Sequence, residues 1–401
     1  MSKLQHTDIA IIGGGASGLV AALSAARLGA AVAVLEKLPR VGKKLLATGN
    51  GRCNLGNLSA DLGAYHGSVD VSSVLARFPG EEAFFAELGL VVRPDEAGRL
   101  YPASGQATSV LDALRLQCAA LGVREVCDFA VREIRPEDGG FLIRSSSGDT
   151  VRARRVVLAC GGMAGPQYGT SGEGLQLAEA LGHSVTVVYP ALGPVAVEPK
   201  AVRALKGLRV QAKVTAVLNG RPDAAPTEEG QVQFGDGVLS GICVFNLAGY
   251  RPEALSLDLV PWCADAVGLL REIASRRAEF LLEDFLTGLV PKRVGQVLLQ
   301  AVTEKPLSTS VSALSEKELT ALAGLMKDWR FAVVPRVDWE AAQVTAGGVT
   351  GVGATLESPI VPGLFFAGEV LDVHGDTGGV NLRWAWASGV VAGCGAAGSL
   401  K

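Results

Sequence analysis

The stretch Asp8-Ile-Ala-Ile-Ile-Gly13-Gly14-Gly15-Ala16-Ser17-Gly18 decides the fold of this chain. An apolar run leads into a Gly-x-Gly-x-x-Gly turn, and an Ala/Leu-rich segment and a second apolar run, 31–35, follow it. This is the order of a strand, a turn, a helix and a strand. Gly13 permits the tight turn, Gly15 lets the backbone approach a pyrophosphate, and Gly18 allows the helix to pack closely on the strand. The start of the helix would offer unpaired N–H groups to that anion.

An acidic residue, Glu36, ends the second apolar run. Its distance from the glycines along the chain is typical of a carboxylate that binds a ribose hydroxyl. A Gly-x-Gly-x-x-Gly sequence on its own can be an ordinary glycine-rich turn. Here it lies between two predicted strands and opens a predicted helix, so the sequence predicts a dinucleotide-binding βαβ unit.

Length and composition favour a cytoplasmic α/β protein with several domains. The chain has 401 residues, which is more than one hydrophobic core usually supports, so two or three domains are expected. With a formal net charge of -3, it lacks the positive field that attracts nucleic acid, and no RNA or DNA partner is expected. The apolar run 9–35 contains Arg27 and several glycines, which argues against a signal peptide and against a membrane span.

The seven cysteines are widely spaced and form no Cys-x-x-Cys motif. This spacing argues against a disulfide framework, a metal site and a dithiol reductase centre. We therefore expect no metal, and we expect most of the cysteines to be small core residues kept reduced in the cytosol.

The segment 42–57 is rich in glycine and asparagine and contains Arg52 and Cys53. Such a composition disfavours both helix and strand, so a loop is expected whose backbone comes close to another group. A solvated turn is the alternative. The position of the segment, directly after the predicted nucleotide site, favours a loop that lines the cofactor.

The next part of the chain predicts the remainder of a nucleotide-binding sheet. Residues 80–125 have helical spacing of apolar positions. Short apolar runs at 131–134, 141–143 and 151–152 alternate with glycine and serine, which predicts a small antiparallel meander. The continuous apolar run 156–159 then predicts a strand buried on both faces, and Gly161-Gly162 follow it. This is the layout of FAD domains of the glutathione-reductase type.

A compositional change near Pro190 predicts an inserted region. Apolar and polar residues alternate over 208–218, as in a half-exposed strand, and frequent Pro and Gly up to Pro261 favour a small antiparallel barrel. Helical spacing over 267–285, and a capping box at Ser315 and Glu318, predict a helical subdomain.

The last segment returns to the nucleotide-binding pattern. A buried strand over 363–367 ends in Gly368-Glu369, and the glycine-rich run 375–382 opens a final helix. A second helix N-terminus of this kind would stabilise negative charge at the far end of an extended cofactor, which favours FAD over NAD. Because the glycines of 348–353 have no preceding predicted strand, we expect no second Rossmann domain for NAD(P)H.

Several motifs resemble those of the bacterial NAD(P)/FAD-dependent oxidoreductases of BaiN type, also labelled aminoacetone-oxidase-like flavoproteins. The resemblance covers nearly the whole chain. The motifs that carry it are 49–54 (GNGRCN), 159–162 (ACGG), 239–245 (LSGICVF), 344–349 (VTAGGV) and 367–373 (AGEVLDV) through 381–382 (NL).

The resemblance implies an α/β fold in which a glutathione-reductase-type FAD-binding Rossmann domain carries an inserted antiparallel β-barrel and a small helical subdomain. The implied FAD domain comprises 1–190 and 345–401. The barrel would comprise 191–262 with a return segment at 331–344, and the helical subdomain 263–330.

The resemblance also implies the residues that bind FAD. The first glycines and Glu36 would hold the AMP half, 51–53 would line the flavin, Gly368-Glu369 would meet the ribityl-phosphate region, and 379–382 would present N–H groups to the flavin N1/O2 edge. The complete predicted set is Gly13, Gly15, Ala16, Ser17, Gly18, Glu36, Lys37, Lys44, Gly51, Arg52, Cys53, Val131, Gly161, Gly368, Glu369, Gly379, Val380, Asn381 and Leu382.

Three residues beside the expected flavin depart from the family pattern. His374 stands where relatives usually carry Asp, Val380 where Tyr is common, and Arg383 where Gln is common. We expect these departures to affect substrate preference more than FAD binding. His374 is the candidate catalytic residue, since a histidine here could exchange a proton near neutral pH. The alternative is a surface histidine on a loop.

The sequence therefore predicts an FAD-dependent oxidoreductase that transfers hydride to or from a small-molecule substrate. NAD(P)H would be a transient reductant that visits the flavin, as the family name implies. A flavin-binding sensor or assembly partner without turnover is the alternative from another class. An RNA-modifying flavoprotein would share the fold but should carry basic clusters, which this sequence lacks.

Overall fold

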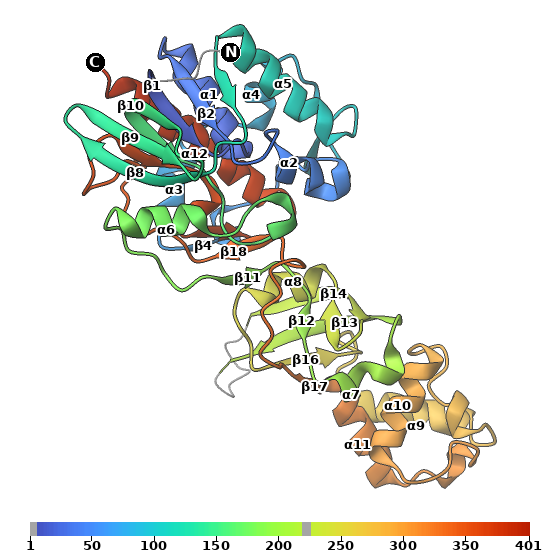
Figure 1. Cartoon of the computed structure of the whole chain (residues 1–401). Coiled ribbons are helices and arrows are strands. Elements are labelled where there is room, and N and C mark those ends of the chain that lie inside the picture. The colour runs from blue at the N-terminus through green and yellow to red at the C-terminus, as the bar shows by residue number, and fades with distance from the viewer. Residues whose placement is uncertain (1–5, 219–225) are drawn as a thin grey trace. The chain divides into compact units, whose positions relative to one another are not determined.

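The structure is a computed structural model that describes residues 6–218 and 226–401. The chain forms two compact units (Figure 1). Unit 1 comprises Met1–Pro190 and Trp339–Lys401, and unit 2 comprises Ala191–Asp338. The finer division predicted from the sequence, with boundaries at 190, 262, 330 and 344, stays a prediction.

A seven-stranded mixed sheet forms the centre of unit 1. Its strand order is β7-β2-β1-β10-β9-β8, and β19 also pairs with β10. The strands β7, β2, β1, β10 and β19 run parallel, whereas β8, β9 and β10 form an antiparallel meander. The strands are β1 (His6–Ile12), β2 (Val32–Leu35), β7 (Arg124–Val126), β8 (Val131–Glu137), β9 (Gly140–Ser145), β10 (Thr150–Leu158) and β19 (Leu364–Phe366).

The predicted βαβ unit, meander and buried strand are confirmed, with one difference. The runs 151–152 and 156–159 belong to a single strand, β10, rather than to two. The first residues of β10, 150–153, pair with β9 of the meander. Its last residues, Val156, Val157 and Leu158, lie between β1 and β19 and are fully buried. A continuous apolar run is needed only where both faces of the sheet are covered.

The helices of unit 1 cover this sheet (Figure 1). Two predictions about them are wrong. Residues 80–125 contain a hairpin between two helices, because glycines and prolines interrupt the helical spacing at 89–102. Residues 43–47 form a short helix inside the expected loop, since the glycine and asparagine cluster starts only at Gly49. The helices are α1 (Ala16–Arg27), α2 (Lys43–Ala47), α3 (Val71–Leu75), α4 (Glu81–Ala86), α5 (Ala107–Ala120), α6 (Glu173–Ala180) and α12 (Val380–Gly398), with 3₁₀ turns η1 (Thr48–Gly51), η2 (Leu62–Ala64), η3 (Pro166–Tyr168) and η7 (Gly368–Val370).

Glycines let α12 approach α1 closely. A Cβ on Gly389 would lie 2.6 Å from the carbonyl oxygen of Ser17, and one on Gly393 would lie 2.3 Å from that of Ala21. A larger residue at either position would push the two helices apart. The contact therefore fixes the last helix of the chain against the first, and brings their N-terminal ends into one region.

Short strands complete unit 1. The strand β18 directly precedes the glycines of 348–353, so the prediction that no strand precedes them is wrong. However, β18 pairs with β11 in a two-stranded sheet and does not begin a second dinucleotide-binding fold. The short strands are β3 (Gly56–Asn57), β4 (Tyr65–Gly67), β5 (Val92–Pro94), β6 (Arg99–Pro102), β11 (Tyr189–Ala191), β18 (Val344–Ala346) and β20 (Val373–Gly375).

The inserted antiparallel barrel is confirmed in unit 2. Six strands follow the order β12-β15-β14-β13-β16-β17, and the two outer strands meet at a bridge between Val197 and Val333. Hydrogen bonds from Glu198 N to Ala332 O (3.2 Å) and from Val334 N to Ala196 O (3.0 Å) close the sheet there. The strands are β12 (Val195–Ala196), β13 (Arg209–Val217), β14 (Thr227–Phe234), β15 (Val238–Ser240), β16 (Ala254–Asp258) and β17 (Trp329–Ala332).

Three helices form the second part of unit 2. The predicted capping box is present, since Ser315 and Glu318 bond each other's backbone N–H groups. The predicted helix 267–285 ends earlier, at Arg276, and Phe280 beyond it is 53% exposed. The helices of this unit are α7 (Pro199–Val202), α8 (Ile242–Ala248), α9 (Ala266–Arg276), α10 (Lys292–Val302) and α11 (Glu316–Lys327), with 3₁₀ turns η4 (Arg203–Leu205), η5 (Leu282–Asp284) and η6 (Val311–Ala313).

Candidate functional site

The first element of the site is the N-terminus of α1. A Cβ on Gly13 would lie 2.6 Å from the carbonyl oxygen of Ala159, and one on Gly18 would lie 1.9 Å from that of Gly13. These two glycines are therefore required by packing. Around Gly15, in contrast, no described atom lies within 4 Å of an added Cβ. Gly15 is the N-cap of α1, and no described side chain caps the helix, so its first N–H groups face open space suited to a pyrophosphate.

The start of α1 lies beside the second glycine turn of the site, although the two are far apart in sequence. Ala16 and Ser17 begin the helix, and Ser17 Oγ donates to Ala367 O at 3.4 Å. A Cβ on Gly368 would lie 2.4 Å from that hydroxyl. Gly368 N in turn donates to Ser388 Oγ of α12 at 2.9 Å. The structure thus brings these predicted residues together.

Glu36 is oriented by two backbone N–H groups, one in the α1 turn and one just after β2. Its Oε2 accepts from Gly14 N at 2.8 Å and its Oε1 accepts from Leu38 N at 2.9 Å, and the side chain is only 9% exposed. A carboxylate has about four acceptor positions, so two remain for a diol. Phe129 N donates to the backbone Glu36 O at 2.9 Å, which places the segment before the meander next to the backbone of Glu36.

Replacing Glu36 by alanine is expected to weaken FAD binding by about 1–3 kcal/mol, because buried N–H groups and the ribose would lose their acceptor. Fluorescence titration of the stripped protein with FAD measures this loss. Arg27→Ala, at the exposed end of α1, is the control and should bind FAD normally. Equal affinities for Glu36→Ala and the parent protein would contradict the assignment of Glu36.

The lysines of the predicted set are engaged in ion pairs. Lys37 pairs with Glu173 and donates to Ser171 Oγ at 3.1 Å. Lys44 pairs with Glu369 at 2.7 Å and also donates to Ala164 O at 3.0 Å. Lys44 and Glu369 therefore form one cluster, whereas Lys37 belongs to the surface near α6.

Glu369 links this cluster to the glycine pair after β10. Its Oε1 accepts from Thr345 N at 2.9 Å, and Thr345 Oγ1 accepts from Met163 N at 2.7 Å. Gly161 has a φ of +73°, and a Cβ on Gly162 would lie 2.3 Å from Thr345 Oγ1. The chain can follow this course only with glycine at these positions. Thr345 is a further residue of this cluster, and the motif 344–349 did not by itself indicate its role.

The loop 48–54 shows backbone strain. Asn50 and Cys53 have φ values of +54° and +58°, a region that costs energy for non-glycine residues and is often found at functional sites. Cys53 is fully buried, and burial raises the pKa of its thiol to about 12, so the thiol stays protonated at neutral pH. Gly51 has a φ of +81°, and the exposed Arg52 stacks its guanidinium 4.1 Å from the ring centre of Tyr101.

The second helix N-terminus of the site is that of α12. Its N-cap Gly379 has a φ of +103°, and no side chain in the described part of the chain caps it. The N–H groups of Val380, Asn381 and Leu382 form its first turn, where helices bind anions. The Asn381 side chain fixes the preceding loop, since it bonds both N and O of Gly375 at 2.8 Å.

Two buried polar atoms beside α12 have no partner. Within residues 6–218 and 226–401, Asn54 Oδ1 and His374 Nδ1 are the buried side-chain N or O atoms that lack a hydrogen bond. Asn54 Oδ1 lies 2.8 Å from the position of a Cβ on Gly379, and His374 precedes Gly375. Buried polar groups without partners are costly and rare, and a bound group often explains them. A flavin ring, with N–H and C=O groups along one edge, offers hydrogen-bonding groups of the kind that Asn54 Oδ1 and the helix N-terminus lack within the described residues.

His374 lies in a different environment from the one expected. It belongs to strand β20 and is only 8% exposed, so the alternative of a surface loop is wrong. It is also not the only histidine of the site. Its register partner on β4 is His66, with 5.2 Å between the ring centres, and His66 Nε2 lies 3.0 Å from Asp376 Oδ1. No motif surrounds His66, and only the pairing of β4 with β20 reveals it.

His374 does not titrate near neutral pH, contrary to the sequence-based expectation. Burial, and secondly the proximity of His66, lower the pKa of His374 to about 4. The carboxylates of Asp372, Asp376 and Glu369 oppose this shift but do not reverse it. At neutral pH His374 is therefore a neutral ring with one N–H donor and one acceptor.

The FAD-free protein is expected to lose stability between about pH 6.5 and pH 4 because of His374. Its pKa is about 4 in the folded chain and 6.5 ordinarily, so in this window only the unfolded chain binds the proton. The stability is fully present above pH 6.5 and falls with pH, by up to about 3 kcal/mol at the lower limit. Urea unfolding of His374→Gln should show a flatter profile in this window, and an unchanged profile would contradict the assignment.

Arg383 forms a buried ion pair with Glu81. Its guanidinium contacts both carboxylate oxygens of Glu81 at 2.6 and 3.0 Å, and the Glu81 side chain is 3% exposed. The same carboxylate lies where a Cβ on Gly56 would be, at 2.0 Å. Arg383 therefore fixes α12 against β3 and α4, which is a structural role that the sequence did not indicate.

Comparison with known proteins identifies the family of the chain. The sequence matches the family described as HI0933-like protein Rossmann domain over residues 7–395. A 3-dehydro-bile acid delta(4,6)-reductase of Clostridium scindens is 37% identical over 408 aligned residues, which cover 97% of this chain and 98% of that protein. Proteins named ribosomal RNA dihydrouridine synthase are 30% identical in Escherichia coli (96% of both chains) and 28% identical in Haemophilus influenzae (96% of this chain and 97% of that one).

The resemblance stated from the motifs is thus confirmed along nearly the whole chain. Neither a membrane-spanning helix nor a cluster of three or more metal-ligating side chains occurs in the described residues. The chain belongs to the HI0933-like family of FAD-binding Rossmann proteins, and it is an FAD-dependent oxidoreductase.

Proposed function

We propose that the protein saturates a carbon–carbon double bond conjugated to a carbonyl group in a small organic molecule. The names of the relatives support this proposal. A 3-dehydro-bile acid delta(4,6)-reductase acts on double bonds in conjugation with a 3-oxo group, and dihydrouridine is uridine saturated at the double bond next to its C4 carbonyl. Both names describe the reduction of an electron-poor double bond. Bound FAD would supply the hydride.

The observation that carries the proposal is the uncapped N-terminus of α12, together with two buried polar side-chain atoms in the adjoining segments that lack partners among the described residues. Its first N–H groups would stabilise negative charge on the reduced cofactor, which favours two-electron reduction. Asn54 Oδ1 would hydrogen-bond the cofactor, and His374 Nδ1 would face the substrate. The residues proposed to hold the cofactor at its other end are those of the α1 turn, with Glu36 for the ribose.

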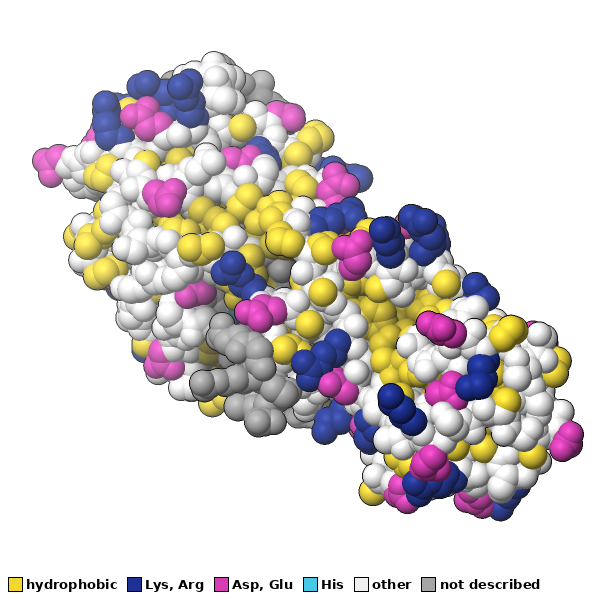
Figure 2. Space-filling model, turned by 90° about the horizontal axis from the view of Figure 1, so that it is seen from below, with side chains coloured by type: hydrophobic (Ala, Val, Ile, Leu, Met, Phe, Trp, Pro, Cys, Tyr) yellow, Lys and Arg dark blue, Asp and Glu magenta, His cyan; other side chains and the backbone are white. Residues whose placement is uncertain are grey.

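A small molecule is favoured over RNA as the substrate. The net charge of -3 provides little attraction for phosphates. On the face drawn in Figure 2, Lys and Arg side chains are interspersed with Asp and Glu side chains rather than gathered in one basic stripe. The alternative of a flavin sensor without turnover receives no support from relatives whose names state a reaction.

We further propose that NAD(P)H reduces the flavin by a transient visit in the cytoplasm. The described strands of unit 2 form an antiparallel barrel, which differs from the parallel sheet of a second dinucleotide domain. All seven cysteines, each of them within the described residues, are free thiols, as expected in a reducing compartment.

Anaerobic mixing tests the proposal. NADH or NADPH should bleach the flavin, and 2-cyclohexen-1-one should then restore its colour. Cyclohexanone and cyclohexene are matched controls that lack either the double bond or the carbonyl, and neither should reoxidise the flavin. A reduced protein that no enone reoxidises would contradict the proposed function.

A further inference from the structure

Three ionisable side chains lie next to one another, from the partly exposed Asp376 through His66 to the buried His374. Asp376 and His66 are 30% and 27% exposed, and they contact each other through Oδ1 and Nε2 at 3.0 Å. His66 stands opposite His374 in the β4–β20 pair, with ring centres 5.2 Å apart. His374 is 8% exposed, and its Nδ1 is buried without a partner.

We propose that Asp376, His66 and His374 form the path that supplies the proton for the reduction. The inference rests on the proposed function and adds a source for the proton that the reaction consumes. His374 would give the proton on its Nδ1 to the substrate. Its Nε2 would take a proton from His66. His66 would be reprotonated from solvent, and Asp376 is a positioning residue that holds the His66 ring.

The chemistry of the proposed reduction requires such a source. A hydride adds to the carbon distant from the carbonyl, the double bond opens, and the carbon next to the carbonyl takes a proton. The substrate gains two electrons and two hydrogens, the reduced cofactor is oxidised, and one proton leaves the path. A donor positioned at the reacting carbon accelerates such a step by about 100-fold or more.

The charges around His374 explain why the path needs two histidines. His374 faces Asp372 and Asp376 on its own segment, Glu369 on η7 and His66 on β4. Burial keeps its ring neutral at neutral pH, so it can pass a proton on but cannot store one. The partly exposed His66, held by the Asp376 carboxylate, is placed to take up protons from water.

The test uses the FAD-loaded protein reduced by NAD(P)H and mixed with 2-cyclohexen-1-one between about pH 6 and pH 8. His374→Gln should slow reoxidation by about 100-fold, within the range for a general acid. His66→Gln and Asp376→Asn should slow it by about tenfold and make the rate fall steeply as the pH rises, because the proton must then come from solvent. Added imidazole should partly rescue His66→Gln, whose site is open to solvent.

Flavin reduction by NAD(P)H and FAD content should be normal in His66→Gln and Asp376→Asn, which separates a role in proton supply from a structural one. His6→Gln, at an exposed histidine of β1, is the matched control and should behave as the parent protein. Superimposable pH profiles for the parent, His66→Gln and Asp376→Asn would overturn the path and leave the proposed function standing. A parent protein that the enone does not reoxidise would overturn both.

Discussion

Replacing Gly15 by aspartate is expected to weaken FAD binding by about 100-fold or more, while the FAD-free protein stays as stable as the parent chain. Gly15 is the N-cap of α1, and aspartate is a preferred N-cap residue that needs no rearrangement of the helix. No described atom lies within 4 Å of the added Cβ, so packing is unaffected. The new carboxylate would occupy the space assigned to the pyrophosphate. The combined clash and charge repulsion should cost roughly 3 kcal/mol or more, about 100-fold in affinity.

Two measurements distinguish this loss from unfolding. Fluorescence titration gives the affinity for FAD, and urea unfolding of the stripped protein gives its stability. Gly353→Asp is the matched control, because it adds the same side chain at another open glycine and should bind FAD normally. If Gly15→Asp retained FAD, the pyrophosphate would have to lie elsewhere, and the central assignment of the α1 turn would fail.

Replacing Arg383 by methionine should destabilise the protein by about 3–5 kcal/mol, because the carboxylate of Glu81 would stay buried without its partner. Glu81 is 3% exposed and accepts two hydrogen bonds from the guanidinium. The double variant Glu81→Gln, Arg383→Gln should recover most of the loss, since neither side chain is then charged. Unfolding by urea at neutral pH measures the three free energies of unfolding.

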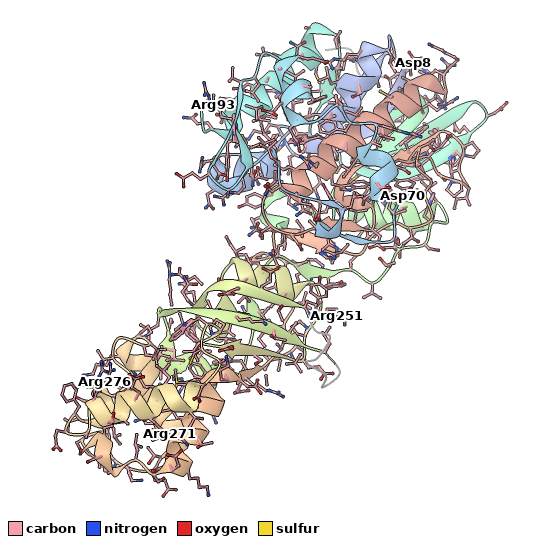
Figure 3. The ribbon with its side chains drawn as sticks, turned by 180° about the vertical axis from the view of Figure 1, so that it is seen from behind. Asp8, Asp70, Arg93, Arg251, Arg271 and Arg276 are labelled. Atoms are coloured by element: carbon pink, nitrogen blue, oxygen red, sulfur yellow. The ribbon has the colours of Figure 1, made fainter. Side chains whose placement is uncertain are left out.

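An exposed ion pair provides the control for Arg383. Arg271 on α9 contacts Glu316, with the two side chains 56% and 59% exposed, and the region around it is shown in Figure 3. Arg271→Met should cost at most about 1 kcal/mol, as for other surface pairs. A similar cost for the two arginines would mean that the Glu81 carboxylate is not as isolated from solvent as the structure shows.

Local patterns in the sequence were sufficient to predict the Rossmann core. The glycine spacing at 13–18, the apolar run of β10 and the alternation over β13 each depend on a few neighbouring residues, and the structure contains all three. Errors arose where short elements depend on context. The hairpin β5–β6 was included in a predicted helical region because the helical spacing of the residues beside it was extended across its glycines and prolines, and Phe280 lies beyond a helix that ends at Arg276.

The candidate site was only partly predictable for the same reason. Positions in glycine motifs could be assigned one by one from the resemblance. His66 could not, because its role depends on the pairing of β4 with β20, some 300 residues apart in sequence. Likewise, Arg383 was expected beside the flavin, and only the fold shows that Glu81 binds it. The low pKa of His374 results from burial, which a sequence does not reveal.

The most direct test of the account is the flavin stoichiometry and electron capacity of the purified protein. We expect a yellow protein with one FAD per chain that takes up two electrons in an anaerobic reductive titration, and in which Gly15→Asp is colourless. Such a result would place the pyrophosphate of the cofactor at the N-terminus of α1. A colourless parent protein that binds NAD but not FAD would contradict the account.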